Sequence, residues 1–166
     1  MRPSKWSTSS GSCERRVGER RRARELALQT LFALEFEARS EELCLRDMRL
    51  RAGEPETDDE DLKDLVRGGL SVQDFAEELV QGVKGHQEEI DAMLGRYSTN
   101  WKVSRMALVD RNILRMACFE LLHLPDVPPK VTLNEAVEIA KRYGSTDSSA
   151  FINGILDRIA SESLAR

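Results

Sequence analysis

The chain has 166 residues, of which 40% are hydrophobic and 33% are charged. This length fits one domain with at most a short tail, and no apolar run reaches the roughly 18 residues that a membrane-spanning helix needs. The net charge of −4 is unevenly spread, since residues 1–24 hold eight basic and two acidic side chains and the rest holds 17 and 27. Such asymmetry indicates that the basic end meets an anionic partner.

The cysteines Cys13, Cys44 and Cys118 stand at unrelated spacings, with no CxxC pair. This pattern argues against a disulfide framework and against a zinc site, and it fits a reducing compartment. The N-terminus carries charge but no apolar segment, so it is not a secretory signal. We therefore expect a cytoplasmic protein.

The N-terminal region predicts a tail followed by a helical domain. Residues 1–17 are rich in Ser, Gly and Arg, which predicts a disordered basic tail before a domain over residues 18–162. A first helix is predicted from about Glu19 to about Ala38. Its core stripe recurs at three- and four-residue steps and consists of Ala23, Leu26, Ala27, Thr30, Leu31 and Leu34.

Residues 40–70 give weaker signals. Residues 41–52 predict one or two helical turns, and the acidic stretch that follows predicts a solvated loop. Gly68-Gly69 predicts a chain break, and Ser71 is the predicted N-cap of a helix that reaches about Tyr97. We expect the two glycines within that helix, Gly82 and Gly85, to permit close helix packing.

The C-terminal half predicts three more helices. A helix is predicted over residues 103–124, and between Ile113 and Leu122 only Arg115 and Glu120 are polar, which is typical of a central helix. Thr132 and Glu135 have the T-x-x-E spacing of a capping box, and a last helix is predicted to start near residues 145–147. Because no segment predicts a strand, we expect an all-α fold, a compact bundle of about six or seven helices.

No pattern typical of an enzyme is present. The chain has neither a GxxxxGK[ST] loop nor a G-x-S-x-G turn after a strand. The two histidines, His86 and His123, lie on different predicted helices and lack metal-ligand spacing. We therefore expect no catalytic residues, no bound metal and no cofactor.

Arginines crowd the start of the first predicted helix. On a helical wheel Arg20, Arg21 and Arg24 lie within about 100° of one another beside the core stripe, and Arg22 lies apart. Guanidinium groups suit phosphate because they bind it bidentately, whereas cations at a helix N-terminus oppose the helix dipole. The pattern predicts a polyanion-binding flank, and an ordinary solvated helix end is the alternative.

Two further features allow two interpretations each. Leu28, Phe32 and Phe36 form a second apolar stripe on the first helix, which is either buried within the domain or presented to a partner protein. Asp110 aligns with an apolar face of its helix, and a buried carboxylate needs a cation. That cation belongs either to this chain or to another protein.

A third patch is KRYGSTDSSAF, residues 141–151. Lys141 and Arg142 add positive charge, and Tyr143 and Phe151 offer aromatic faces on which unstacked bases can rest. The start of the following helix offers N–H groups to phosphates. The alternative places both rings in the core.

Three segments resemble the family of the transcription antitermination protein NusB. They are RRRARELALQTLF, LVDRNILRMACFELL and DVPPKVTLNEAVEIAKRYGSTDSSAFINGILDRIA, in the order and spacing of that family. The resemblance implies two small helical subdomains without catalysis. It also implies binding to the ribosomal protein NusE and to boxA-type single-stranded RNA. The complex would join RNA polymerase and other Nus factors to suppress termination, chiefly in ribosomal RNA operons.

The resemblance also implies roles for particular residues. It assigns RNA contacts to Arg20, Arg21, Arg24, Tyr143, Asp147, Ser148 and Phe151. It assigns contacts with NusE to Phe32, Phe36 and Asp110.

Two alternatives stay open. A NusB-like domain stands at the front of some ribosomal RNA cytosine methyltransferases, but these need a further α/β domain, for which we expect no room in 166 residues. In the other alternative the chain is a helical adaptor that binds only proteins, and its arginines serve solubility.

Overall fold

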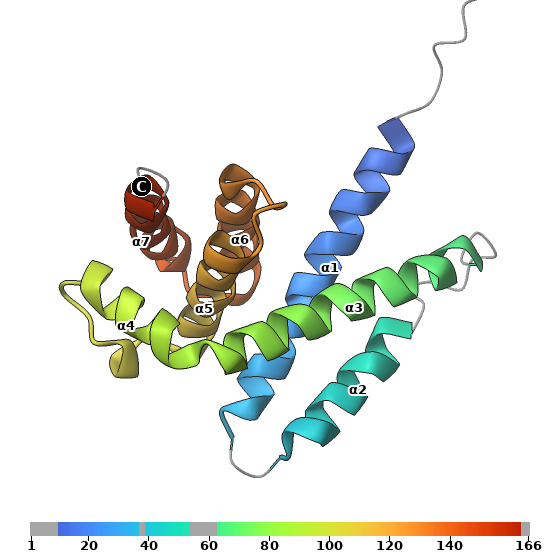
Figure 1. The fold of residues 1–166 in the computed structure, drawn as a ribbon, viewed down its shortest axis with the longest axis horizontal. Coiled ribbons are helices and arrows are strands. Elements are labelled where there is room, and N and C mark those ends of the chain that lie inside the picture. The colour runs from blue at the N-terminus through green and yellow to red at the C-terminus, as the bar shows by residue number, and fades with distance from the viewer. Residues whose placement is uncertain (1–9, 37–38, 54–62, 164–166) are drawn as a thin grey trace, which may run out of the picture.

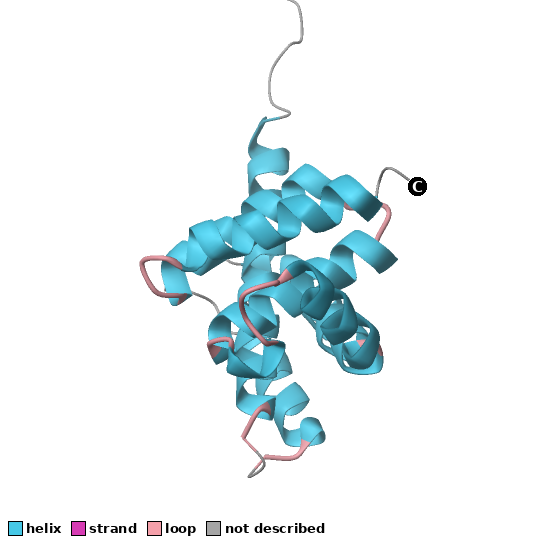
Figure 2. Cartoon of the chain, turned by 90° about the vertical axis from the view of Figure 1, so that its left-hand side faces the viewer, coloured by secondary structure: helices cyan, strands magenta, loops and turns pink. Residues whose placement is uncertain are grey.

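The computed structural model describes residues 10–36, 39–53 and 63–163. These residues form helices joined by short loops, with no strand among them (Figure 2), as the sequence predicted. The helices are α1 (Ser10–Leu34), α2 (Glu41–Gly53), α3 (Lys63–Gly85), α4 (Gln87–Tyr97), the 3-10 helix η2 (Val103–Arg105), α5 (Leu108–His123), α6 (Pro129–Tyr143) and α7 (Ser148–Ser163). No helix of the described part is both long and apolar enough to cross a membrane.

The helices form two groups that share one core. Helices α1, α2 and α3 pack on one another, and α4, α6 and α7 gather around α5 (Figure 1). The groups are joined because α1 and α3 also pack on α5. A single hydrophobic cluster runs through both, from Leu31 and Leu79 to Ile113 and Ile152. The α5 helix is central, as its nearly continuous apolar sequence predicted.

Helix α1 buries the predicted stripe but begins earlier than predicted. Ala23, Leu26, Ala27, Thr30 and Leu31 are buried, and Leu34 packs partly against the core. The helix starts at Ser10 rather than near Glu19, so the prediction of a disordered tail is wrong for the backbone of residues 10–17. Once a helix has formed, each added residue gains one backbone hydrogen bond for the ordering of one residue. This gain outweighs the low helix propensity of Ser and Gly. Residues 1–9 lie outside the described residues.

The predicted break at Gly68-Gly69 is wrong, because α3 runs through both glycines and through Ser71. Helix α3 packs along α1 and α2. This packing outweighs the penalty of about 1 kcal/mol that a glycine brings to a helix interior. Helix α2 has 13 residues rather than one or two turns. Most of the predicted acidic loop falls on residues 54–62, which lie outside the described residues.

Helices α3 and α5 approach closely at Gly82. A Cβ atom built on Gly82 would lie 2.1 Å from Cζ of Phe119 on α5, so the predicted packing role of this glycine is confirmed. Gly85 has no neighbour within 4 Å of such a Cβ. It ends α3, and therefore the single helix predicted up to Tyr97 is two helices, α3 and α4.

The predicted capping box at Thr132 and Glu135 is wrong. Helix α6 begins at Pro129, because proline fits the first turn of a helix, where its missing N–H is not needed. Thr132 and Glu135 therefore lie inside the helix, where their side chains bind partners on other helices. The Thr132 hydroxyl donates to the Glu120 carboxylate at 3.0 Å.

Filling the space at Gly82 should destabilise the protein. We expect Gly82→Ala to lower the free energy of unfolding by about 1–3 kcal/mol, because the buried Phe119 ring has to move. The measurement is urea unfolding followed by circular dichroism. Gly95→Ala in α4 is the matched control, since no atom lies within 4 Å of its added methyl group. Equal effects of the two substitutions would contradict a tight α3–α5 contact.

Candidate nucleic-acid and protein interface

Arg20 is the exposed member of the predicted arginine flank. Its guanidinium lies over the ring of Phe75 on α3, with 4.1 Å between Cζ and the ring centroid. Phe75 is buried and Arg20 is exposed, so the guanidinium rests on the edge of the core and still reaches solvent. A cation over an aromatic ring is attracted by the ring's electron-rich face. The contact therefore orients Arg20 without neutralising it.

Arg21 is half-exposed and bound to α6. Its Nε and Nη2 atoms each donate to the Glu135 carboxylate at 2.9 Å. The side chain of Arg21 keeps 41% of its surface exposed, whereas that of Glu135 keeps 8%. The hydrogen bonds to Glu135 raise the pKa of Arg21 above its ordinary value. These bonds use two of the five N–H donors of the guanidinium.

Arg24 is not on the surface, so its predicted place on the exposed flank is wrong. It is 4% exposed, and its Nε and Nη2 atoms donate to the Glu120 carboxylate on α5 at 2.7 and 2.8 Å. Thr132 on α6 donates to the same carboxylate. The buried pair thus joins three helices. A helical wheel shows only the direction of a side chain around the helix axis. It does not show that Arg24 lies one turn further along α1 than Arg20, where α3 and α5 cover it.

Arg22 lies on another side of α1, as the wheel predicted. Its Nη2 atom donates to the backbone carbonyl of Arg51 on α2 at 3.2 Å. The four arginines therefore have four different surroundings: Arg20 lies on α3, Arg21 is bound to α6, Arg22 is bound to α2, and Arg24 is buried against α5.

The junction of α6 and α7 lies next to the middle of α1. Arg142 donates to Glu25 of α1 at 2.8 Å, and its guanidinium also lies 5.4 Å from the Tyr143 ring centroid. With the Arg21–Glu135 pair, this makes two ion pairs that cross between α1 and α6. Sequence analysis missed both acidic partners, since Glu25 and Glu135 lie more than 100 residues from the arginines they bind.

The turn between the helices is shaped by Gly144 and Ser148. The Ser148 hydroxyl accepts a hydrogen bond from the backbone N–H of Ser145 at 2.8 Å. A Cβ on Gly144 would lie 2.6 Å from that hydroxyl oxygen, so the turn needs glycine. Ser148 is 2% exposed, which makes it a structural residue of the turn. Asp147 beside it is exposed.

The two aromatic residues of the third patch are partly buried. Tyr143 and Phe151 pack against the hydrophobic core and retain some exposed surface. Each ring therefore belongs partly to the core and also offers some surface. We define the arginine surface as Arg20, Arg21, Arg142, Tyr143 and Asp147.

The second apolar stripe of α1 divides between core and surface. Leu28 is 2% exposed, whereas Phe32 is 37% and Phe36 is 52% exposed. The two phenylalanine rings meet edge to face, with centroids 5.3 Å apart. An exposed aromatic pair is a common anchor for a protein partner.

Asp110 lies on α5, the helix to which the residues that follow α1 are bound. It is buried in the first turn of α5, and its Oδ1 atom has no hydrogen-bond partner among the described residues. Glu35, next to Phe36, accepts hydrogen bonds from Arg111 at 3.0 Å and Asn112 at 3.3 Å. These bonds hold the end of α1 against the start of α5. We define the aromatic surface as Phe32, Phe36 and Asp110.

A buried arginine fixes this end of the molecule. Arg115 donates to Glu35, which directly follows α1, at 2.8 Å and to both oxygens of Asp91 on α4 at 2.8 Å. Burial lowers the pKa of Arg115, but the hydrogen bonds and charges of Asp91 and Glu35 outweigh burial and raise it overall. The guanidinium therefore stays charged and ties α1, α4 and α5 together.

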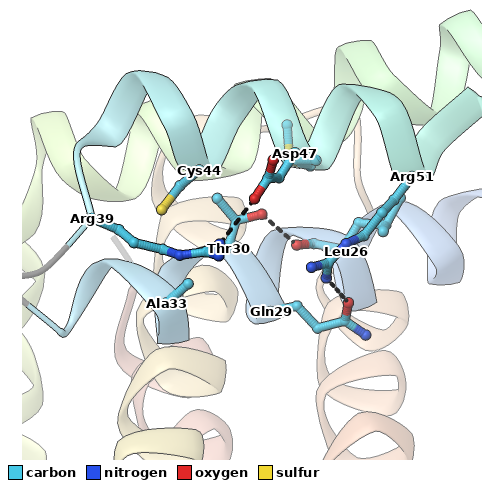
Figure 3. Close-up of a pocket in the computed structure, with 9 residues that line it drawn as sticks. Leu26, Gln29, Thr30, Ala33, Arg39, Cys44, Asp47 and Arg51 are labelled. Atoms are coloured by element: carbon cyan, nitrogen blue, oxygen red, sulfur yellow. Dashed lines mark hydrogen bonds and ion pairs between the residues drawn. The ribbon is translucent and has the colours of Figure 1, made fainter.

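A cavity between α1 and α2 is too small for a ligand. It has a volume of about 50 Å³, whereas pockets for small molecules have roughly 300–1,000 Å³. Residues that line the cavity bind one another: Arg39 forms an ion pair with Asp47, and Arg51 donates a hydrogen bond to Gln29 (Figure 3). This cavity is a packing gap lined by polar groups.

The fold and the two surfaces define an all-helical binding protein with charge at one place and exposed aromatic rings at another. Comparison with known proteins agrees with this class. The model of the NusB family matches residues 21–161. The transcription antitermination protein NusB of Myxococcus xanthus is 44% identical over 87% of this chain and 96% of its own. That of Geobacter sulfurreducens is 46% identical over the same shares. The chain belongs to the NusB family.

Solved structures share the fold. NusB of T. maritima has a TM-score of 0.70 at 39% sequence identity, covering 86% of this chain and 91% of its own. A crystal structure of the antitermination factors NusB and NusE with double-stranded RNA gives a TM-score of 0.70 at 22% identity. That match covers 87% of this chain and 97% of the other, and it shows the fold alone.

Removing the charge that holds Arg24 should destabilise the fold. We expect Glu120→Gln to lower the free energy of unfolding by on the order of 3 kcal/mol, because it leaves a buried guanidinium without its counter-charge. The measurement is urea unfolding. Glu25→Gln, the same change at the exposed Arg142 pair, should lose less than about 1 kcal/mol. If Glu120→Gln lowers the free energy of unfolding no more than Glu25→Gln does, the buried pair does not have the structural role given to it here.

Proposed function

We propose that this protein is a transcription antitermination factor that binds boxA-type RNA together with the ribosomal protein NusE. The complex joins RNA polymerase and other Nus factors on nascent transcripts, chiefly those of ribosomal RNA operons, and suppresses termination. Membership of the NusB family and the names of the relatives support this function. The proposed role is binding without catalysis or cofactor, in the cytoplasm where transcription takes place.

The observation that carries the RNA-binding proposal is the pair of ion bridges between α1 and α6. Arg21–Glu135 and Arg142–Glu25 hold α1 against α6 beside the α6–α7 junction, and Arg20, the exposed residue next to Arg21, lies over Phe75 of α3. Neither bridge buries its arginine, since the side chains of Arg21 and Arg142 remain 41% and 66% exposed. A phosphate can therefore compete for these guanidinium groups, which bind phosphate bidentately.

The α6–α7 junction supplies groups suited to bases. The partly exposed Tyr143 ring offers a face for stacking, and the exposed Asp147 carboxylate accepts hydrogen bonds from base edges. Phe151 and Ser148 act indirectly, because one packs under the junction and the other shapes its turn. Arg24 has no direct part, since Glu120 holds it inside the core.

The aromatic surface suits a protein partner. Exposed Phe32 and Phe36 offer apolar area, and Asp110 offers a buried carboxylate oxygen whose hydrogen-bonding capacity is unused within the described residues. A cation of the partner placed there satisfies Oδ1 and forms a hydrogen-bonded pair shielded from water. We assign this surface to NusE.

Removing the guanidinium of Arg20 should weaken RNA binding without unfolding the protein. We expect Arg20→Ala to raise the Kd of the NusE-bound protein for a boxA-like strand about tenfold, and to reduce the slope of log K against log[salt] by about 1. The measurement is fluorescence anisotropy at several salt concentrations. Arg20 is a sharper probe than Arg21, whose removal also strips the counter-charge from Glu135.

The control is Arg96→Ala, an exposed arginine on α4, which packs mainly on α5 and α7. It should leave the Kd unchanged. A scrambled strand and a duplex are measured alongside the boxA-like strand, because the NusB–NusE crystal structure contains double-stranded RNA. No RNA binding by any form of the complex would favour the protein-only adaptor instead.

Changing Asp110 should weaken the NusE complex and spare the fold. We expect Asp110→Asn to raise the Kd for NusE at least about tenfold, because it removes the charge that the partner's cation meets. The unfolding midpoint should not fall, since Oδ1 has no internal hydrogen bond to lose. Isothermal titration calorimetry and thermal unfolding give the two quantities. A lower midpoint with an intact complex would assign Asp110 to the fold.

Phe36→Ala tests the aromatic part of the same surface. It should also weaken the complex, because an aromatic anchor contributes through its buried area. The matched control is Leu50→Ala, since Leu50 is a large exposed hydrophobic side chain on α2. Equal binding by the Phe36 and Leu50 variants would remove Phe36 from the interface.

A further inference from the structure

The two histidines that sequence analysis separated lie together in the structure. His86 is the residue before α4, Glu89 is in the first turn of α4, and His123 is the last residue of α5. The ring centroids of His86 and His123 are 4.0 Å apart. One donor atom from each of the three residues lies within 4.8 Å of the other two. None of the three belongs to the arginine surface or to the aromatic surface.

The tautomer of His86 is set by the backbone. Its Nδ1 atom lies 2.9 Å from the carbonyl oxygen of Gly82, and a carbonyl only accepts, so Nδ1 carries the proton and donates. In the neutral ring Nε2 then holds a lone pair. A backbone carbonyl bound to the far nitrogen is the arrangement that orients metal-ligating histidines.

His123 has a nitrogen that its surroundings do not satisfy. Its Nε2 atom is buried and lacks a hydrogen-bond partner among the described residues, which is unfavourable for a polar atom. The nearest charged group is the Glu89 carboxylate, with 3.5 Å between Nε2 and Oε2. This separation is close to the roughly 3.3 Å between two ligand atoms of a tetrahedral zinc ion, given zinc–nitrogen bonds of about 2.0 Å.

Aromatic packing explains only part of this cluster. Both rings lie near the Phe119 ring, with centroid distances of 5.7 Å for His86 and 5.3 Å for His123. Stacking accounts for the positions of the rings. It does not give the buried Nε2 of His123 a hydrogen-bond partner, and it does not explain why the Glu89 carboxylate lies beside that atom. Two imidazole nitrogens and one carboxylate oxygen form a recurrent ligand set for transition metals.

We propose that His86, Glu89 and His123 form a binding site for a divalent transition metal ion of the Zn²⁺ class. Two imidazole nitrogens and one carboxylate oxygen bind the ion, and a water molecule completes a tetrahedron. Imidazole ligands favour Zn²⁺ over Mg²⁺ and Ca²⁺, which prefer oxygen. The side chain of Glu89 is 55% exposed, so it can turn to bring its carboxylate to the ion.

Such an ion links parts of the chain that are far apart in sequence. His86 and Glu89 belong to the junction of α3 and α4, and His123 belongs to the end of α5. A positive ion at the C-terminal end of α5 also interacts favourably with the dipole of that helix. The metal therefore links the junction of α3 and α4 to the end of α5.

The test uses the full-length protein, freed of any histidine tag and stripped of metal with a chelator. Isothermal titration with ZnCl₂ should give one ion per chain. Co²⁺ in place of Zn²⁺ should give the intense visible absorption of a four-coordinate ion without a thiolate band, which separates this site from the cysteines. Mg²⁺ in excess should not compete.

Variants locate the ion. His86→Gln, His123→Gln and Glu89→Gln should each weaken Zn²⁺ binding at least about tenfold, and Glu88→Gln, the exposed neighbour on the same helix, should not. Circular dichroism checks that each variant is folded, and Glu89→Gln, on an exposed side chain, keeps the test decisive if a histidine variant unfolds. Failure of the unaltered protein to bind one Zn²⁺, or equal affinity in the His86→Gln, His123→Gln double variant, would overturn the proposal.

Discussion

The buried ion pair between Arg24 and Glu120 is the constraint on which both surfaces depend. It is almost fully removed from solvent and has two short hydrogen bonds, and Thr132 adds a third contact from α6. A charge in this position needs its partner, because breaking a buried pair leaves an unsolvated ion. The pair therefore fixes α1 against α5 and α6, and the placement of every exposed residue on α1 follows from it.

Successive arginines along α1 pass from surface to core. Arg20 rests on Phe75 and faces solvent, Arg21 shares a half-exposed bridge with Glu135, and Arg24 is enclosed. The same residue type is thus exposed at one turn, where we propose that it binds RNA, and stabilises the core at the next. The difference comes from the neighbouring helices, since α3 and α5 cover the turn that contains Arg24.

Periodicity in the sequence was sufficient for the class of fold, the core stripe of α1 and the central place of α5. It was insufficient wherever a side chain binds a distant segment. Thr132 and Glu135 have the spacing of a local cap, yet their partners are on α5 and α1. Likewise a wheel cannot separate Arg20 from Arg24, and linear spacing hides the approach of His86 to His123. Periodicity left open whether Phe32, Phe36 and Asp110 belong to the core or to a surface. Only the resemblance to the NusB family favoured a surface role for them.

Helix α1 runs without interruption from the arginine surface to the first residue of the aromatic surface. Arg20 and Phe32 are separated by about 18 Å along its axis at 1.5 Å per residue. A helix packed on three others along this length is a stiff rod. Under the proposed function, a protein bound at Phe32 and an RNA strand bound at Arg20 would therefore be held at a fixed spacing. Only partners whose own dimensions match that spacing can touch each other across it.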